Sequence, residues 1–395
     1  MSGAPAVRTG LDVLCAQGFA NLRGTRVGLV AHAAAVDANL QPATDLFLAA
    51  PGVKLTALFG PEHGLQGTAQ DLASVPNADD PVSGLRIHSL YGDTFDSLRP
   101  NPDQLQGLDV LVIDLVDIGS RYYTFQGTML LCMEAAAGRG VRVVILDRPN
   151  PLGGEVVEGP TLSAGFESFV GLHPVATRHG MTMGELALMY QRERGLRCEL
   201  DVIRCEGWRR RHWFDETSLP WVLPSPNMPT LDTATVYPGQ CLLEGTNLSE
   251  GRGTTRPFEL CGAPWIEPRS LLARLKAASL PGVAFRPAWF TPTFQKWAGQ
   301  TCGGVQVHVT DRDAFGSVRT SLALLDAFRA VSGPRFDWRR DPYEFVADRL
   351  AIDLLFGGSR ERTALENGTP TADIARAWEA EETAFRVRRQ PFLLY

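Results

Sequence analysis

Glu62 and His63 stand side by side in the segment FGPEHGLQG, directly after the apolar run Lys54 to Leu58. A glycine on each side of the pair allows a tight bend. A carboxyl group at the end of a buried strand is partly desolvated, which can raise its pKa enough for general acid catalysis near neutral pH. The competing interpretation is structural: Glu62 caps a following helix or pairs with an arginine, and His63 holds the loop through a backbone carbonyl.

A second group of candidates lies in the segment VIDLVDIGSRYYTF. Asp114 and Asp117 are carboxylates at the end of a predicted buried strand, where apolar residues are usual, so each is a candidate for catalysis. Each could equally be a structural cap or the partner of an arginine. Arg121 could bind a substrate carboxylate through two parallel hydrogen bonds. Tyr122 and Tyr123 could stack on a sugar ring or simply wedge the sheet.

The third group lies in the glycine-rich segment CLLEGTNLSEGRGTTRPFE. Its candidate substrate-binding residues are Glu244, Asn247, Glu250, Arg252 and Arg256. Glycines and short polar residues let the backbone approach a ligand closely while donors and acceptors point inward. The structural alternative is an ordered loop whose acids and arginines pair among themselves.

Short β-rich runs alternate with helical patterns through the first part of the chain. The predicted strands are residues 26–31, 54–59, 85–90, 108–115 and 141–146, and the helices predicted between them are 44–50 and 128–139. This alternation predicts an α/β fold with a Rossmann-like, mostly parallel, doubly wound sheet. Ligands of such sheets bind beyond the carboxyl ends of the strands. His32, which follows the first strand, is therefore a further substrate-binding candidate.

The rest of the chain predicts a second, smaller α/β domain. Its loops are rich in proline and glycine, its predicted strands are 199–205 and 304–310, and its helical patterns are 182–194, 317–331, 343–355 and 372–386. One core seldom grows beyond ~250 to 300 residues, so 395 residues favour two domains. We expect a Rossmann-like catalytic domain at 1–155, which later segments could join. Residues 156–395 then form a loop-rich and C-terminal α/β domain that completes the cleft.

The composition is that of an ordinary globular protein, with 44% hydrophobic and 21% charged residues. A net charge of -6 offers no basic field for nucleic acid, and no apolar run approaches the ~20 residues of a membrane helix. Neither partner is expected. The first residues lack the apolar core of a signal peptide, so a cytoplasmic location is expected. The sequence gives no indication of an oligomeric state.

Common cofactor and hydrolase motifs do not occur in the sequence. GxGxxG, GxxxxGK[ST], GxSxG and HExxH are all missing, and the seven cysteines include no CxxC pair. We therefore expect no cofactor and no metal, and the remaining chemistry centres on carboxylates.

Several longer segments, in order along the chain, resemble the exo-β-N-acetylmuramidases of the NamZ type. They are FGPEHG, DLVDIGSRYYTF, DRPNPLGG, RHGMTMGELA, WVLPSPNMP, EGTNLSEGRGTTRPFE, FTPTF and CGGVQVHV, and the resemblance runs from Arg26 to Leu355. It implies a Rossmann-like domain joined to a smaller α/β domain. It also implies an exo-acting glycosidase that releases N-acetylmuramic acid from the non-reducing end of peptidoglycan fragments such as MurNAc-GlcNAc.

The resemblance places the proposed catalytic acid of the family on Glu62. Two positions depart from the family pattern: Ala31-His32 replaces a usual Thr-Asn pair, and Val116 replaces an amide in the motif DLVD. An arginine is expected to face the lactyl carboxylate of muramic acid; the candidates are Arg121, Arg252 and Arg256.

The second catalytic role stays open. Either another carboxylate acts as nucleophile or base, or the acetamido group of the substrate attacks the anomeric carbon. The candidate carboxylates are Asp114, Asp117, Glu244 and Glu250. Two other functions also fit the residues. One is a metal-dependent hydrolase that uses Asp114, Asp117 and His63, and the other is a non-catalytic protein that binds muropeptides.

Overall fold

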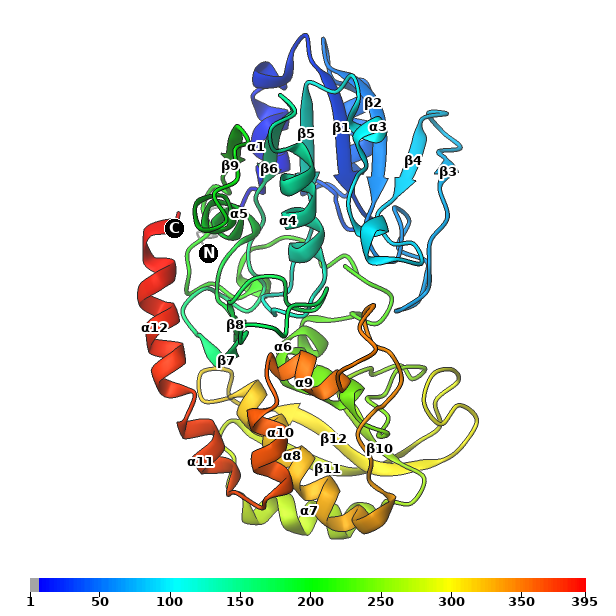
Figure 1. Ribbon diagram of the computed structural model, residues 1–395, viewed down its shortest axis with the longest axis vertical. Coiled ribbons are helices and arrows are strands. Elements are labelled where there is room, and N and C mark those ends of the chain that lie inside the picture. The colour runs from blue at the N-terminus through cyan, green and yellow to red at the C-terminus, as the bar shows by residue number, and fades with distance from the viewer. Residues whose placement is uncertain (1–6) are drawn as a thin grey trace.

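A seven-stranded sheet forms the core of the N-terminal lobe in the computed structural model, which describes residues 7–395 (Figure 1). The strand order is β3-β4-β2-β1-β5-β6-β9, and every neighbouring pair is parallel except β3 and β4. The strands are β1 (Arg26–Ala31), β2 (Lys54–Gly60), β3 (Ala78–Asp79), β4 (Arg86–Ser89), β5 (Val110–Asp114), β6 (Arg142–Leu146) and β9 (Leu200–Ile203).

Helices cover both faces of this sheet. Strands β1, β5 and β6 are buried along almost their whole length, as expected where both faces of a parallel sheet are covered. Residues of α1 and α2 pack on one face, and residues of α4 and α5 pack on the other. The predicted doubly wound α/β fold is confirmed. The helices of the lobe are α1 (Gly10–Ala16), α2 (Ala43–Ala49), α3 (Pro102–Leu105), α4 (Phe125–Ala136) and α5 (Met183–Glu193).

The second lobe is smaller and is built on a three-stranded antiparallel sheet in the order β10-β12-β11. Its strands are β10 (Leu260–Ala263), β11 (Val283–Phe290) and β12 (Cys302–Val309). Its helices are α6 (Leu231–Gln240), α7 (Pro268–Ala277), α8 (Ser317–Ser332), α9 (Ala351–Phe356), α10 (Arg360–Glu366), α11 (Thr371–Arg376) and α12 (Glu379–Arg389). Gly239 lets α6 cross α8 closely, because a Cβ there would lie 1.9 Å from the Ser317 carbonyl oxygen.

The two lobes meet along several connections. The hairpin of β7 (Glu158–Thr161) and β8 (Ala176–Arg178) lies between them, and α12 runs along one side from the lower lobe to the upper (Figure 1). Arg389, at the end of α12, donates to the carbonyls of His179 and Gly180 in the N-terminal lobe. No helix within residues 7–395 combines the length and the apolarity that crossing a membrane requires.

Three parts of the chain differ from the expected elements. The N-terminal lobe continues past residue 155, as the expected first domain allowed for, because β9 completes its sheet. The predicted helix 343–355 is wrong except for α9, since Glu344 and Phe345 adopt left-handed φ values of 46° and 67°. The predicted helix 372–386 is divided into α11 and α12 around the fully buried Trp378.

Candidate active site

A pocket with an empty volume of about 530 Å³ lies between the two lobes and is called here the acidic pocket. The N-terminal lobe contributes residues at the carboxyl ends of β2 and β5, and the second lobe contributes α6 and the loops before β10 and α9. The acidic and basic side chains of its wall are Glu62, His63, Asp71, Glu244, Arg252 and Glu344.

The sharp bend after β2 presents Glu62 to this pocket. Gly60 is required at the start of the bend, because a Cβ there would lie 2.6 Å from the Leu65 backbone nitrogen. His63 has a left-handed φ of 70°, and its Nδ1 lies 2.8 Å from the Ala69 carbonyl oxygen. This hydrogen bond fixes the bend. The side chain of Glu62 is therefore held at the sheet edge and is buried in the pocket wall.

Thr124 orients the Glu62 carboxyl group. Its hydroxyl donates to Glu62 Oε2 at 2.6 Å, and its backbone forms the N-cap of α4, the helix that follows β5. A hydrogen bond thus connects Glu62, which follows β2, to the N-terminus of α4, which follows β5.

Glu344 is a second buried carboxyl group in the same pocket and comes from the second lobe. Figure 1 shows the segment before α9 rising toward the upper lobe. Among the described residues Glu344 has no ion-pair partner; its hydrogen-bonding neighbour is Tyr91, whose hydroxyl donates to Glu344 Oε2 at 3.3 Å. Burial, and then the negative charge of Glu62, raise the pKa of Glu344 well above its usual value. The charge of Glu62 therefore acts on Glu344 across the pocket.

Arg252 connects the acids on the opposite wall. Its Nη1 lies 2.8 Å from Glu244 and 3.2 Å from Glu250, and its Nε lies 3.4 Å from Asp71. Its guanidinium group also stacks over the ring of Phe258. Burial lowers the pKa of Arg252, but the three carboxylates outweigh burial and raise it well above the ordinary value. Arg252 is therefore a permanently charged member of the pocket wall.

Glu244 and Glu250 differ in their access to the pocket. Glu244 lines the pocket and accepts a hydrogen bond of 2.8 Å from the Tyr343 hydroxyl. Glu250 lies behind the wall and pairs with Lys296 at 3.0 Å. Burial raises the pKa of Glu250, but the charges of Lys296 and Arg252 exceed this effect and lower it. Only Glu244 of this pair is positioned to contact a ligand.

Asp114 and Asp117 lie outside the acidic pocket. The two oxygens of Asp114 accept hydrogen bonds of 2.5 and 2.9 Å from Arg148, which makes Asp114 one half of a buried ion pair. Asp117 accepts a hydrogen bond of 2.6 Å from the Gly119 backbone and lies 3.4 Å from His179 Nε2. These contacts match the structural alternatives that the sequence allowed for both residues.

Arg121 and His32 also direct their side chains to backbone groups. The guanidinium group of Arg121 is fully buried and donates to three carbonyls, those of Pro160, Val175 and Leu355. This side chain joins the lobes and does not border the acidic pocket. The sequence could not distinguish this arrangement from a carboxylate clamp, because both need the same guanidinium donors.

His32 uses both nitrogens of its ring. Nε2 accepts from the Val116 backbone at 3.0 Å, so Nδ1 carries the proton and donates to the Pro224 carbonyl at 3.2 Å. Burial and the nearby charge of Arg148 lower the pKa of His32 to about 3. The imidazole is therefore neutral, and it stacks edge-on against Phe125, a residue of the pocket wall.

The remaining candidates divide between the pocket and the surface. Tyr122 and Tyr123 line the acidic pocket, where Tyr122 donates to the Pro238 carbonyl. Asn247 instead donates to the Arg335 carbonyl at 2.8 Å, and Arg256 pairs with Glu259 at 3.2 Å. Neither Asn247 nor Arg256 borders the pocket.

Several residues that complete the pocket carry no clear signal in the sequence. Asp71, Thr124, Glu344 and the aromatic residues Tyr237 and Tyr343 were not among the candidates. Thr124 could have been found, because it lies inside the segment that supplied Asp114 to Tyr123. Glu344 stands in DPYEF, an acid between two aromatic residues in a pattern interpreted as helical.

The fold and this pocket define the class of protein as a two-lobed, Rossmann-like α/β protein with an interlobe site rich in carboxylates. Within residues 7–395, no three His, Cys, Asp or Glu side chains are grouped as metal ligands would be.

Comparisons with known proteins identify the family. Residues 27–232 match the family described as exo-beta-N-acetylmuramidase NamZ, N-terminal, and residues 235–395 match its C-terminal counterpart. The chain is 44% identical over 391 residues to the peptidoglycan beta-N-acetylmuramidase NamZ of Bacillus subtilis (strain 168), covering 99% of this chain and 92% of that protein. The chain therefore belongs to the NamZ family of exo-β-N-acetylmuramidases, which are glycosidases.

Two solved structures share the fold. A DUF1343 family protein from Bacteroides fragilis NCTC 9343 has a TM-score of 0.90 and 34% identity, with 99% of both chains covered. A second DUF1343 family protein from the same organism has a TM-score of 0.76 and 28% identity, over 98% of this chain and 99% of that one. The two-lobed architecture thus extends over nearly the whole chain.

Proposed function

We propose that this protein is an exo-acting glycosidase that removes N-acetylmuramic acid from the non-reducing end of peptidoglycan fragments such as MurNAc-GlcNAc, with Glu62 as general acid. Membership of the NamZ family supports the reaction class. The observation that carries the residue assignment is the presentation of Glu62 in the acidic pocket, oriented by the hydroxyl of Thr124 at 2.6 Å.

A general acid must hold a proton at the working pH, and Glu344 is the neighbour that can supply one. Burial, and then the negative charge of Glu62, raise the pKa of Glu344 well above its usual value, so Glu344 holds a proton near neutral pH. The hydroxyl of Tyr91 donates to Glu344. In the proposed reaction Glu62 donates a proton to the glycosidic oxygen, with Glu344 as the neighbouring proton source.

Arg252 is the arginine that we assign to the lactyl carboxylate of muramic acid. Of the three arginines considered, it alone borders the acidic pocket, because Arg121 is bound to backbone carbonyls and Arg256 lies outside. A guanidinium group held by fixed carboxylates is already oriented, so a substrate carboxylate would meet a rigid donor. Glu244, which is next to Arg252, is the remaining predicted carboxylate with access to the bond to be cleaved.

The test compares Glu62→Gln with the wild type on two substrates, MurNAc-GlcNAc and an aryl β-N-acetylmuraminide with a good leaving group. A general acid contributes roughly 10²- to 10⁴-fold to the rate, and an aryl oxygen needs far less protonation than a sugar oxygen. We expect kcat/KM on the disaccharide to fall by that factor in Glu62→Gln and to fall much less on the aryl substrate. The matched control is Glu206→Gln, an exposed glutamate outside the pocket.

Three results would contradict the proposal. Absence of release from both muraminides by the wild type would remove the substrate assignment. Equal losses on the two substrates would remove the acid role of Glu62. Loss of wild-type activity with chelator, and recovery with magnesium or manganese, would favour a metal-dependent hydrolase.

A further inference from the structure

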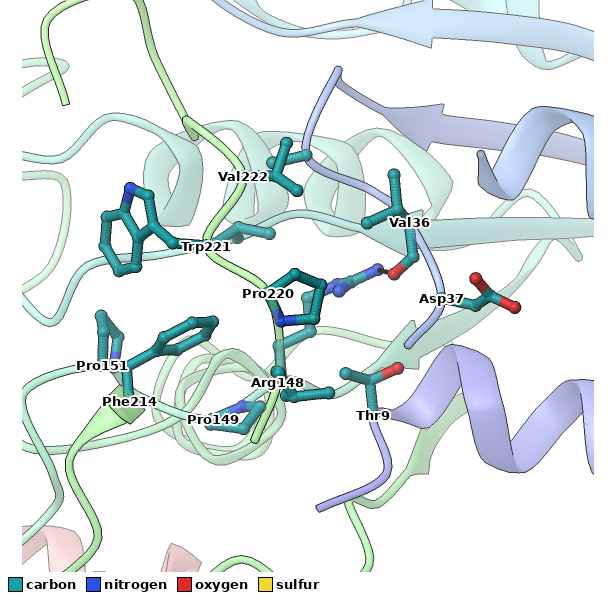
Figure 2. A pocket seen from close by; sticks show the side chains of 13 residues that line it. Thr9, Val36, Asp37, Arg148, Pro149, Pro151, Phe214, Pro220, Trp221 and Val222 are labelled. Carbon is teal, nitrogen blue, oxygen red and sulfur yellow. Dashed lines mark hydrogen bonds between the residues drawn. The ribbon is translucent and has the colours of Figure 1, made fainter. Parts of the chain in front are cut away.

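A second pocket lies on the N-terminal lobe, away from the acidic pocket, and shares no lining residue with it. It has an empty volume of about 510 Å³ and is called here the proline pocket. Its walls include Val36, Arg148, Pro149, Pro151, Pro220 and Trp221. Figure 2 shows the chain of Pro220 to Val222 crossing in front of the guanidinium group of Arg148. The proposed function uses none of these side chains.

The position of the proline pocket in the sheet is typical of a ligand site. Strand β2, which follows β1 in the chain, lies on one side of β1. Strand β6, which follows β5, lies on the opposite side of the β1–β5 pair. The direction in which strands are added to the sheet therefore reverses between β1 and β5. Open α/β sheets bind ligands at such a reversal, beyond the carboxyl ends of the strands. Val36 follows β1, Val116 follows β5 and Arg148 follows β6, and all three residues line the pocket.

The Arg148 side chain has one hydrogen-bond donor that is not engaged within the described residues. Arg148 donates through Nε and Nη2 to Asp114 and through Nη2 to the Val36 carbonyl, and its Nη1 has no hydrogen-bond partner among residues 7–395. Asp37, the other charged residue of the wall, accepts hydrogen bonds from the Asn39 and Gln41 backbones. The charge of Arg148 is neutralised by Asp114, so an anionic ligand would gain little.

We infer that the proline pocket binds a neutral acetamido group, with its carbonyl oxygen accepting from Arg148 Nη1 and its methyl group against the proline and aromatic walls. A donor bordered mainly by apolar side chains favours one acceptor on an otherwise apolar ligand. Two parts of a peptidoglycan fragment carry this chemistry, the N-acetyl group of an amino sugar and the amide-linked alanine of a peptide. The choice of these sources rests on the proposed function, whereas the acetamido chemistry does not.

Trp221 provides a signal for occupancy of this pocket. Its ring lines the proline pocket, stacks edge-on against Phe214, and donates through Nε1 to the Met228 carbonyl at 3.2 Å. Met228 belongs to the wall of the acidic pocket. A ligand in the proline pocket therefore contacts the segment that separates the two sites, and Trp221 fluorescence reports its arrival.

The experiment titrates the full chain with N-acetylglucosamine, with N-acetyl-L-alaninamide and with glucose, which lacks the acetamido group. Affinity is measured by calorimetry and location by Trp221 fluorescence. We expect saturable binding of at least one acetamido compound, no binding of glucose, and loss of the fluorescence change in Trp221→Phe. Val36→Phe fills the pocket and should weaken the affinity at least tenfold, with Val222→Phe as a second filling variant. Thermal melting checks that each variant is folded.

The outcomes separate the two sources and the two proposals. Tighter binding of the sugar supports an amino-sugar site, and tighter binding of the alaninamide supports a peptide site. Equal binding of glucose, no binding of either acetamido compound, or unchanged affinity in a folded filling variant would overturn the inference. Because binding is measured without turnover, each of these failures leaves the glycosidase proposal standing.

Discussion

Replacement of His32 by asparagine isolates one source of acid sensitivity in the N-terminal lobe. The ring of His32 is buried and neutral, and both of its nitrogens are hydrogen-bonded to backbone groups, those of Val116 and Pro224. Burial, and then the charge of Arg148, disfavour its protonation. Asparagine offers one donor and one acceptor without a titrating group.

The magnitude follows from the lowered pKa of His32, which is about 3 instead of 6.5. A group with a depressed pKa stabilises the fold fully above its unfolded pKa, and this stability is lost as the pH falls toward the folded pKa. At pH 5 the pH lies about 1.5 units below the pKa of 6.5 of the unfolded histidine, which is therefore protonated, while the folded histidine stays neutral. At about 1.4 kcal/mol per unit, the wild type loses about 2 kcal/mol between pH 8 and pH 5 from this residue.

The assay is urea unfolding of the wild type and His32→Asn at pH 8 and pH 5, followed by circular dichroism. At pH 8 the variant should be less stable, because it loses the edge-on contact with Phe125, whose ring centroid lies 4.7 Å away. At pH 5 the difference between the two proteins should shrink by about 2 kcal/mol. The same difference at both pH values would refute the assignment of a buried, neutral His32.

Three further replacements test the roles of single side chains. Arg121→Met removes three hydrogen bonds to carbonyls and should lower the free energy of unfolding in urea by about 3 kcal/mol or more. The ratio of muraminide to glucosaminide activity should not change. A changed ratio would restore a substrate-binding role for Arg121. Arg252→Lys keeps the positive charge but loses the planar guanidinium group beside Glu244. We expect kcat/KM on the muraminide to fall about tenfold or more. An equal fall on the glucosaminide would count against recognition of the lactyl carboxylate. Tyr395→Phe removes a hydrogen bond of 2.7 Å to Asp147, and burial raises the pKa of that carboxyl group to about 6. We expect the free energy of unfolding to fall by about 1 to 3 kcal/mol at pH 8. An unchanged urea midpoint would show that this contact is dispensable.

Strands β1, β5 and β6 could be predicted because each is a short, mostly apolar run that is followed by polar residues. Glu62 could be predicted for the same reason: its segment follows such a strand directly and contains the glycine that the bend requires. In these cases the structure that the local sequence pattern favours is also the structure that the residues adopt in the folded protein.

Glu344 could not be predicted, because its position depends on contacts between segments far apart in the chain. Its neighbours had been interpreted as a helix, yet the backbone takes left-handed φ values there and reaches across to Tyr91. The direction of a guanidinium group is equally invisible in a sequence. Arg121 and Arg252 stand in similar glycine-containing segments, but one is bound to carbonyls and the other to carboxylates.

The carboxyl pair of the acidic pocket has a consequence for the timing of activity. Glu62 follows the second strand of the chain, whereas Glu344 lies on a segment that follows the three-stranded sheet and α8 of the second lobe. During synthesis the first lobe can form its sheet, but the neighbouring proton source of Glu62 does not yet exist. Under the proposed function, hydrolysis is expected only after both lobes have folded, and a nascent or truncated chain that lacks Glu344 is expected to be inactive.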